Sequence, residues 1–215
     1  MSLWAIIPVK PLNRAKSRLS EVLSPQQRSD FAEMMFRRML RVLGDVPQVT
    51  GTLVISRDSK ALSIARDFGA KTVQEGSPSD LNPALTRATE VVRLWRGNAV
   101  LILPADLPFI TKDDVTNIAE LGKYGETVVL ATDYQQDGTN AMLVRPPGLI
   151  PYKYGEKSFD RHRVAAKLAG ADVKIYESDT VSLDIDVPDD LEKFNNMVVD
   201  KHFEYLMPFL PDMTA

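Results

Sequence analysis

Several features that define large functional classes are missing from this chain of 215 residues. It has no cysteine, so it can form no disulfide, thiol nucleophile or zinc-thiolate site. It has only two histidines, His162 and His202, and neither stands at a metal-ligand spacing. Any chemistry must therefore depend on carboxylates, amines, hydroxyls and backbone groups.

Long apolar runs and a basic excess are also lacking. No stretch approaches the roughly 18 apolar residues of a membrane span, and the N-terminus has no basic region before an apolar stretch. The net charge is -3 and the pI is about 5.5, which argues against a nucleic-acid-binding protein. We therefore expect a cytoplasmic protein with no membrane or nucleic-acid partner, whose ligand can still be a small anion.

Short apolar runs alternate with amphipathic stretches in the first half of the chain. Strands are expected at residues 3–9, 52–56, 71–73 and 99–103. Helices are expected to begin at Ser24–Pro25, near Ala61, at Asn82–Pro83 and at Thr111. Such alternation predicts an α/β fold with a doubly wound, mostly parallel sheet and helices on both faces.

The second half is less regular. Strands are expected at 127–132, 141–145 and 173–176, and helices at 158–169 and from 191 to 198. With no internal repeat or linker, residues 1–215 are expected to form a single domain. An apolar tail from about residue 201 is expected to pack on the core or against a second subunit.

A basic loop follows the first expected strand. It carries Lys10, Arg14, Lys16 and Arg18 without an acid among them. Ligands of doubly wound sheets bind beyond the carboxyl ends of the strands, and these cations can neutralise a polyphosphate. The alternative is an ordinary solvated loop, because the P-loop and dinucleotide glycine motifs are absent. Its place after the first strand favours phosphate binding.

An acid follows the buried strand at 99–103. Asp106 lies between Pro104 and Pro108, which restrict the backbone, and it is well placed to bind Mg²⁺. The alternative is that Asp106 only caps a turn.

A second acidic segment alternates with apolar residues. In an extended strand Asp184 and Asp186 project from one face, opposite Leu183 and Ile185, and two such carboxylates can share a cation. The following pair, Asp189 and Asp190, is better explained by the start of a helix.

Two further loops carry polar residues, at 137–140 and 154–158. Gly155 allows close backbone approach, and the N–H groups and hydroxyl at Ser158 can hold an anion at a helix N-terminus. The alternative for Ser158 is a plain helix N-cap.

Four segments together resemble the 2-phospho-L-lactate guanylyltransferase family over nearly the full chain. They are residues 6–11 (IIPVKP), 15–19 (AKSRL), 104–108 (PADLP) and 138–140 (GTN). The resemblance implies the nucleotide-diphosphate-sugar transferase type of fold. It also implies a homodimeric enzyme that joins GMP from GTP to 2-phospholactate or phosphoenolpyruvate, releases pyrophosphate and serves coenzyme F-420 biosynthesis.

The same resemblance implies roles for individual residues. Asp106, Asp184 and Asp186 are expected to hold magnesium, and Thr139, Gly155 and Ser158 to contact the phosphorylated acid. The basic loop is expected to hold the GTP phosphates, Lys10 and Lys16 to act with Asp106 in catalysis, and Asn82 to contact the nucleotide. The chain has Pro8-Val9-Lys10 where many wider relatives carry a glycine pair.

Two alternative functions remain open at this point. One is a nucleotidyltransferase for another acceptor, such as a cytidylyltransferase acting on a sugar or polyol phosphate. The other is a non-catalytic nucleotide-binding module on the same scaffold.

Overall fold

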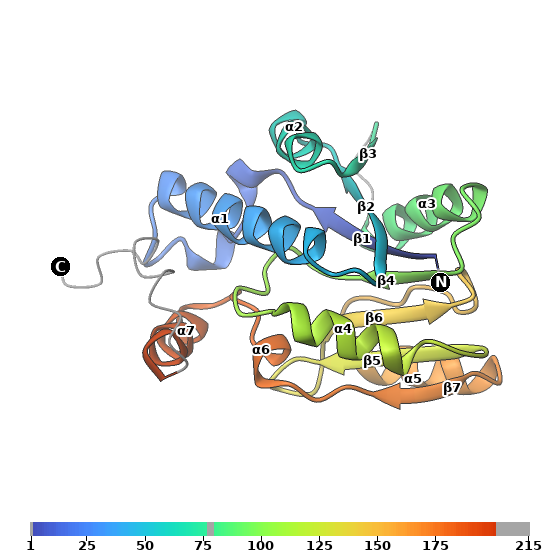
Figure 1. The fold of residues 1–215 in the computed structure, drawn as a ribbon. Helices are drawn as coiled ribbons and strands as arrows, with labels where there is room; N and C mark the ends of the chain where they lie inside the picture. Colours follow the sequence, from blue (N-terminus) through green and yellow to red (C-terminus); the bar gives the residue numbers. More distant parts are fainter. Residues whose placement is uncertain (1, 77–79, 201–215) are drawn as a thin grey trace.

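The computed structural model describes residues 2–76 and 80–200 (Figure 1). The apolar tail expected from about residue 201 lies outside the described residues. No helix in the described ranges is both long enough and apolar enough to cross a membrane.

One sheet runs through the described part of the chain (Figure 1). Its seven strands follow the order β3-β2-β1-β4-β6-β5-β7. They are β1 (Leu3–Val9), β2 (Val49–Ser56), β3 (Lys71–Gln74), β4 (Ala99–Ile102), β5 (Thr127–Thr132), β6 (Thr139–Arg145) and β7 (Asp172–Ile175). All neighbouring pairs are parallel except those of β6 with β4 and β5, so the predicted mostly parallel sheet is confirmed.

Helices cover both faces of this sheet. The α-helices of the described residues are α1 (Pro25–Gly44), α2 (Ser59–Asp67), α3 (Leu81–Leu94), α4 (Lys112–Leu121), α5 (Ser158–Leu168), α6 (Asp179–Ser182) and α7 (Pro188–Asp200), of which α7 packs against α1 rather than on the sheet. One core cluster joins α1, α2 and α4 to the sheet, and a second joins α3 and α5 to its other face. This arrangement confirms the doubly wound fold.

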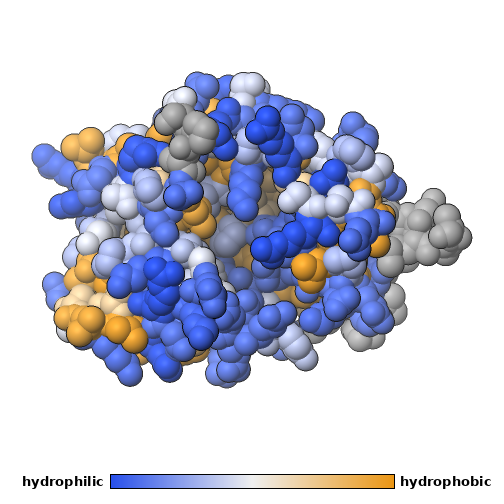
Figure 2. Space-filling view, turned by 180° about the vertical axis from the view of Figure 1, so that it is seen from behind, coloured by the Kyte–Doolittle hydropathy of each residue, from blue (hydrophilic) through white to orange (hydrophobic). Residues whose placement is uncertain are grey.

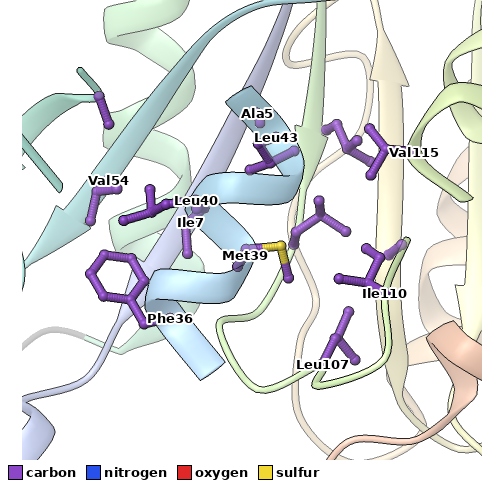
Figure 3. Packing of buried hydrophobic residues seen from close by; sticks show 14 of the residues in the cluster. Ala5, Ile7, Phe36, Met39, Leu40, Leu43, Val54, Leu107, Ile110 and Val115 are labelled. Atoms are coloured by element: carbon purple, nitrogen blue, oxygen red, sulfur yellow. The ribbon is translucent and has the colours of Figure 1, made fainter. Parts of the chain in front are cut away.

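Strand β1 shows why the apolar runs are nearly continuous. Ala5 and Ile7 face the core under α1, whereas Ile6 faces the core under α3, and all three are fully buried. Leu40 of α1 lies beside Ile7 (Figure 3). A strand buried on both faces leaves no position for polar side chains. Each fully buried aliphatic side chain contributes roughly 1.5–3 kcal/mol of burial free energy.

The helix starts follow the expected signals. The Ser24 hydroxyl accepts a hydrogen bond from the N–H of Gln27, whose side chain accepts from the Ser24 N–H in return. Thr111 and Asp114 form the same reciprocal pair at α4. Such boxes satisfy N–H groups that a helix start leaves without partners.

Two elements of the second half differ from the prediction. Strand β6 begins at Thr139 rather than Ala141, and it runs antiparallel to β4, so its first residues lie at the carboxyl edge of β4. The segment with Asp184 and Asp186 belongs to no strand. It links α6 to α7, and Asn140 donates to the carbonyls of Val181 and Ser182 just before it.

Candidate active site

A groove of about 260 Å³ lies at the carboxyl ends of β1, β2 and β4, the edge at which ligands bind in this type of sheet. The face of the molecule that carries α3 and α5 is hollowed among hydrophilic side chains (Figure 2). The charged residues that line the groove are Lys10, Lys16, Arg57, Glu75, Asp106 and Asp186. Its apolar walls include Ile55, Ala84 and Ile102.

Lys16 is the central cation of this groove. Its Nζ lies 2.7 Å from Oδ2 of Asp106 and 3.1 Å from Oδ1 of Asp186, and its side chain is only 6% exposed. Burial lowers the pKa of the ammonium, but the charges of Asp106 and Asp186 outweigh burial, and the pKa is raised above its usual value. Lys16 therefore stays charged and fixed between two carboxylates.

The backbone at Lys16 is unusual. Its φ is 54°, in the left-handed region that most non-glycine residues avoid. Lys16 stands at the start of a short 3-10 helix, Ser17–Leu19, and the buried Leu19 anchors the loop that follows it. This unfavourable backbone conformation at Lys16 is retained in the loop that places its ammonium in the groove.

Asp184 lies beside the other two acids. Burial, followed by the charges of Asp106 and Asp186, raises the pKa of Asp184 to about 6. For Asp186 burial also favours the neutral form, but Lys16 outweighs it and the pKa is lowered. Leu183 and Ile185 are buried, so the predicted alternation holds although the segment is not a strand. Asp106 and Asp186 thus meet at Lys16, and Asp184 is close enough for their charges to raise its pKa; the role of the three as metal ligands stays a prediction.

The donor set suits a hard divalent cation, because repulsion among the three carboxylates is relieved by positive charge. Within the described residues no three acidic or histidine side chains form a ready cage for a metal ion. Mg²⁺ needs no such cage, since it is commonly held by one or two carboxylates together with substrate phosphates and water. The residues present therefore fit this ion.

The other cations of the basic loop take different places. Lys10 lines the same groove, whereas Arg14 lines a neighbouring hollow with Asp58 and Lys60. Arg18 is 73% exposed on its side chain, and its Nη1 lies 3.8 Å from Asp186. The loop therefore does not gather its four cations at one point.

Thr139 and Ser158 meet in a buried hydrogen-bond network with His162. The Lys153 N–H donates to Nε2 of His162 at 2.8 Å, so Nδ1 carries the proton of the neutral ring and donates to Oγ1 of Thr139 at 3.0 Å. Ser158 Oγ also donates to Thr139 Oγ1, at 3.2 Å. Burial, and then the charges of Arg161 and Lys153, lower the pKa of His162 to about 4.

The N-terminus of α5 differs from the prediction. Lys157, with φ 53°, occupies the N-cap position, and Ser158 is the first helical residue rather than the cap. The N–H groups of Ser158 and Phe159 donate to the carbonyls of Gly155 and Asp137. Gly155 has φ 120°, which favours glycine, and none of Thr139, Gly155 and Ser158 lines the groove.

Asn82 contacts protein rather than the groove. Its Nδ2 donates to the Tyr154 carbonyl at 3.2 Å, and its Oδ1 accepts from the Tyr154 N–H at 2.7 Å. Tyr154 lines the groove and packs edge-on against His162. In this structure Asn82 positions a groove residue, and its direct contact with a nucleotide stays a prediction.

Sequence reasoning missed several residues of this region. Asn140 is 5% exposed, and its Nδ2 lies 3.4 Å from Oδ1 of Asp184. His162 gave no spacing signal. Glu75 stands directly after β3, so the rule that singled out Asp106 also applies to it. Asp114 accepts from Tyr176, Ser178 and Thr180, and so anchors the chain that leads to Asp184.

Comparison with known proteins gives consistent similarities. The family model described as "Guanylyl transferase CofC like" matches residues 3–207. A phosphoenolpyruvate guanylyltransferase of Rubrobacter xylanophilus is 39% identical over 90% of this chain and 93% of its own length. A 2-phospho-L-lactate guanylyltransferase of Methanothermobacter thermautotrophicus is 34% identical over 89% and 83%.

Solved structures resemble the fold at much lower identity. A protein of Desulfovibrio desulfuricans G20 assigned to the nucleotide-diphospho-sugar transferases gives a TM-score of 0.77 at 14% identity, covering 95% of this chain and 91% of that one. A CMP:2-keto-3-deoxy-manno-octonic acid synthetase complexed with CTP gives 0.62 at 14% identity, covering 94% and 100%. The predicted fold type is confirmed.

Proposed function

The chain belongs to the CofC-like guanylyl transferase family, and we propose that it joins the GMP unit of GTP to phosphoenolpyruvate and releases pyrophosphate. The observation that carries the proposal is the Lys16 ammonium held between Asp106 and Asp186 in a groove at the sheet edge. The 39% identical relative supports phosphoenolpyruvate as acceptor. The relative at 34% supports 2-phospho-L-lactate as the second candidate.

The proposed reaction needs little general base catalysis. A phosphate oxygen of the acceptor, already ionised, attacks the α-phosphorus of GTP and forms a new P–O bond. The bond from the α-phosphorus to the oxygen that bridges to the β-phosphorus breaks, and pyrophosphate leaves with the electron pair. Positioning and charge neutralisation are therefore the main tasks of the protein.

Residues of the groove match these tasks. Lys16 and Lys10 are proposed to stabilise charge on the phosphates of GTP, with Arg14 and Arg18 attracting the triphosphate from more exposed positions. Asp106, Asp184 and Asp186 are proposed to hold Mg²⁺, which when bound neutralises phosphate charge. Because Lys16 bonds two of these acids, it also fixes their side chains.

The acceptor is proposed to bind on the other side of Asp184, near Thr139, Gly155 and Ser158. Thr139 Oγ1 accepts hydrogen bonds from His162 and Ser158, so its own hydrogen is left to donate. A hydroxyl fixed as a donor suits an anionic carboxylate or phosphate. Asn140, the residue after Thr139, donates to Asp184.

The remaining assignments follow from family membership and composition. We propose one nucleotidyltransferase domain over residues 1–215 that acts as a homodimer in the cytoplasm, with its product used in coenzyme F-420 biosynthesis. The single sheet shared by all described strands supports one domain.

Pyrophosphate release tests the proposal. The enzyme is incubated with GTP and Mg²⁺ and either phosphoenolpyruvate or 2-phospho-L-lactate, with CTP, ATP and UTP as controls. Release that requires GTP and an acceptor is expected. A preference for CTP would favour the sugar or polyol phosphate cytidylyltransferase, and GTP binding without any release would favour a binding module.

Two aspartate variants test the proposed site. Asp106→Asn is expected to lower kcat about 10²- to 10³-fold, since it removes a charge beside Lys16 and the proposed ion. Asp189→Asn, in the exposed first turn of α7, is expected to change kcat less than about 3-fold. Equal losses in both variants would contradict the assignment.

A further inference from the structure

Glu75 places a carboxylate at the end of the groove away from Lys16. It follows β3 directly, and its N–H donates to the carbonyl of Ser56 at 3.0 Å, which fixes it at the carboxyl edge of the sheet. Its side chain is 10% exposed and lines the groove. An acid so enclosed needs partners, because a buried unpaired charge is costly.

Arg87 on α3 supplies one such partner. Its Nη2 lies 2.7 Å from Oε1 of Glu75. The guanidinium orients the carboxylate, and carboxylate oxygens accept hydrogen bonds. At this end the groove is therefore lined by an oriented carboxylate, whose Oε1 also accepts from Arg87.

The position of Glu75 suits the base of a nucleotide. Its strand, β3, lies three places from β4 in the sheet, which puts the two strand ends about 14 Å apart. The phosphate-binding groups Lys16 and Asp106 lie at the β1 and β4 end. Between the ends, Ile55, Ala84 and other apolar side chains form walls suited to a flat ring.

Hydrogen-bond chemistry then selects among the bases. Two acceptor oxygens side by side match two parallel N–H donors, and guanine offers such a pair at N1 and the 2-amino group. Adenine and cytosine place a ring-nitrogen acceptor beside their amino group, and uracil flanks its N–H with two carbonyls. A carboxylate facing those edges meets at least one repulsive acceptor.

We propose that Glu75 is the residue that selects guanine, with Arg87 as its positioning residue. The inference rests on the proposed use of GTP and adds the contact that distinguishes GTP from the other nucleotides.

Nucleotide analogues test this in the unaltered protein. Binding of GTP, inosine triphosphate and xanthosine triphosphate is measured calorimetrically with Mg²⁺ and without acceptor. Inosine triphosphate lacks the 2-amino group, and we expect its Kd to be about 10-fold higher than that of GTP. Xanthosine triphosphate turns a carbonyl toward Glu75, and we expect at least about 100-fold weaker binding. Equal binding of the three would overturn the proposal.

The variant Glu75→Gln should shift the binding preference from GTP toward xanthosine triphosphate. The amide offers one acceptor and one donor, which pair with the N1–H and 2-carbonyl of xanthine. We expect the ratio of the Kd for xanthosine triphosphate to that for GTP to fall at least about 100-fold. An unchanged ratio in a folded variant would overturn the proposal.

Matched variants control for folding and charge. Glu90→Gln alters another glutamate paired with an arginine of α3, Arg93, outside the groove, and should leave the ratio unchanged. Glu75→Asp keeps the charge but withdraws the oxygens, and should weaken GTP binding without favouring xanthine. If Glu75→Gln does not fold, Glu75→Asp and the analogue series still decide the matter.

The two proposals fail separately. Because binding is measured without acceptor, a wrong acceptor assignment leaves the analogue series intact. GTP-dependent pyrophosphate release together with equal binding of all three analogues would uphold the enzyme and remove Glu75 from base selection.

Discussion

The two halves of the sheet present different chemistry at the same edge. The parallel half, β3-β2-β1-β4, ends in an open groove lined by charged side chains from the loops that follow its strands. The half formed by β6, β5 and β7 carries a closed network in which Thr139, Ser158 and His162 are each at most 4% exposed. One half offers charge, and the other offers hydrogen bonds of fixed direction.

The difference matches the two proposed substrates. A triphosphate with several negative charges is attracted by cations and accommodated by an open groove. A small acid with few atoms offers little surface, so its recognition depends on precisely oriented donors in a desolvated place. Asp106, Asp184 and Asp186 lie where the two halves meet.

Lys16→Gln should break the nucleotide half most severely. Removing the ammonium leaves Asp106 and Asp186 facing one another and withdraws charge stabilisation, so we expect kcat/KM for GTP to fall about 10³-fold. Arg18→Gln, which changes an exposed cation near Asp186, should cost less than about 10-fold. Steady-state pyrophosphate release measures both, and similar losses would show that net charge matters rather than the buried contact.

His162→Gln should change how the stability of the protein depends on pH, through the closed network of the second half. The pKa of His162 is lowered from 6.5 to about 4. Between these two pH values His162 is protonated in the unfolded chain but neutral in the folded chain. Neutral His162 therefore contributes about 3 kcal/mol to the free energy of unfolding. This contribution is fully present above pH 6.5 and is lost as the pH falls through 4. Urea unfolding at several pH values should show this loss in the wild type and a smaller loss in the variant. If the free energy of unfolding depended on pH equally in both proteins, the conclusion that His162 is neutral and buried would be wrong.

Thr139→Val should affect the acceptor half alone. The isosteric change removes the hydroxyl that accepts from His162 and Ser158, and we expect KM for the acceptor to rise about 30-fold while KM for GTP changes less than about 2-fold. Thr72→Val, on β3 in the other half, serves as control. A rise in KM for GTP without a rise in KM for the acceptor would contradict the assignment of the acceptor to the half that contains Thr139.

Asn82→Ala should have the smallest effect. Loss of both hydrogen bonds to Tyr154 loosens one wall of the groove, and we expect kcat/KM for GTP to fall about 5-fold. Gln26→Ala, whose side chain bonds Asp30 on the exposed side of α1, should have no measurable effect. A loss above about 100-fold would indicate that Asn82 contacts the nucleotide directly, as the family resemblance implies.

The same contrast explains how far sequence reasoning reaches. The place of Asp106 in the groove was predictable because a single acid after a buried strand is a local pattern; its role stays a prediction. Asp184 and Asp186 were predictable because burial of Leu183 and Ile185 sets which side the acids face, whether or not a neighbouring strand pairs with the segment. These local patterns do not show that Lys16 lies between Asp106 and Asp186, which are 90 and 170 positions from it.

The network of the other half joins residues distant in the chain. Thr139 and His162 are 23 positions apart, and Asn82 and Tyr154 are 72 apart. No periodicity encodes such pairs, so the role of His162 and the partner of Asn82 emerged only with the structure. The antiparallel course of β6 was equally hidden, because a strand pattern does not reveal direction.

That reversed strand has a consequence for how the enzyme can diversify. Because β6 runs against β4 and β5, the hairpin turn between Thr132 and Thr139 lies at the substrate edge rather than at the opposite one. A side chain at Gly138 would force Asp133 to move, since an added Cβ would stand 2.6 Å from Oδ2 of Asp133. With the acceptor bound as proposed, we expect changes in the length or composition of this turn to affect the acceptor while the groove on the parallel half stays intact. The proposed acceptor site thus borders a hairpin turn, whereas the proposed nucleotide groove is formed by the loops that follow parallel strands.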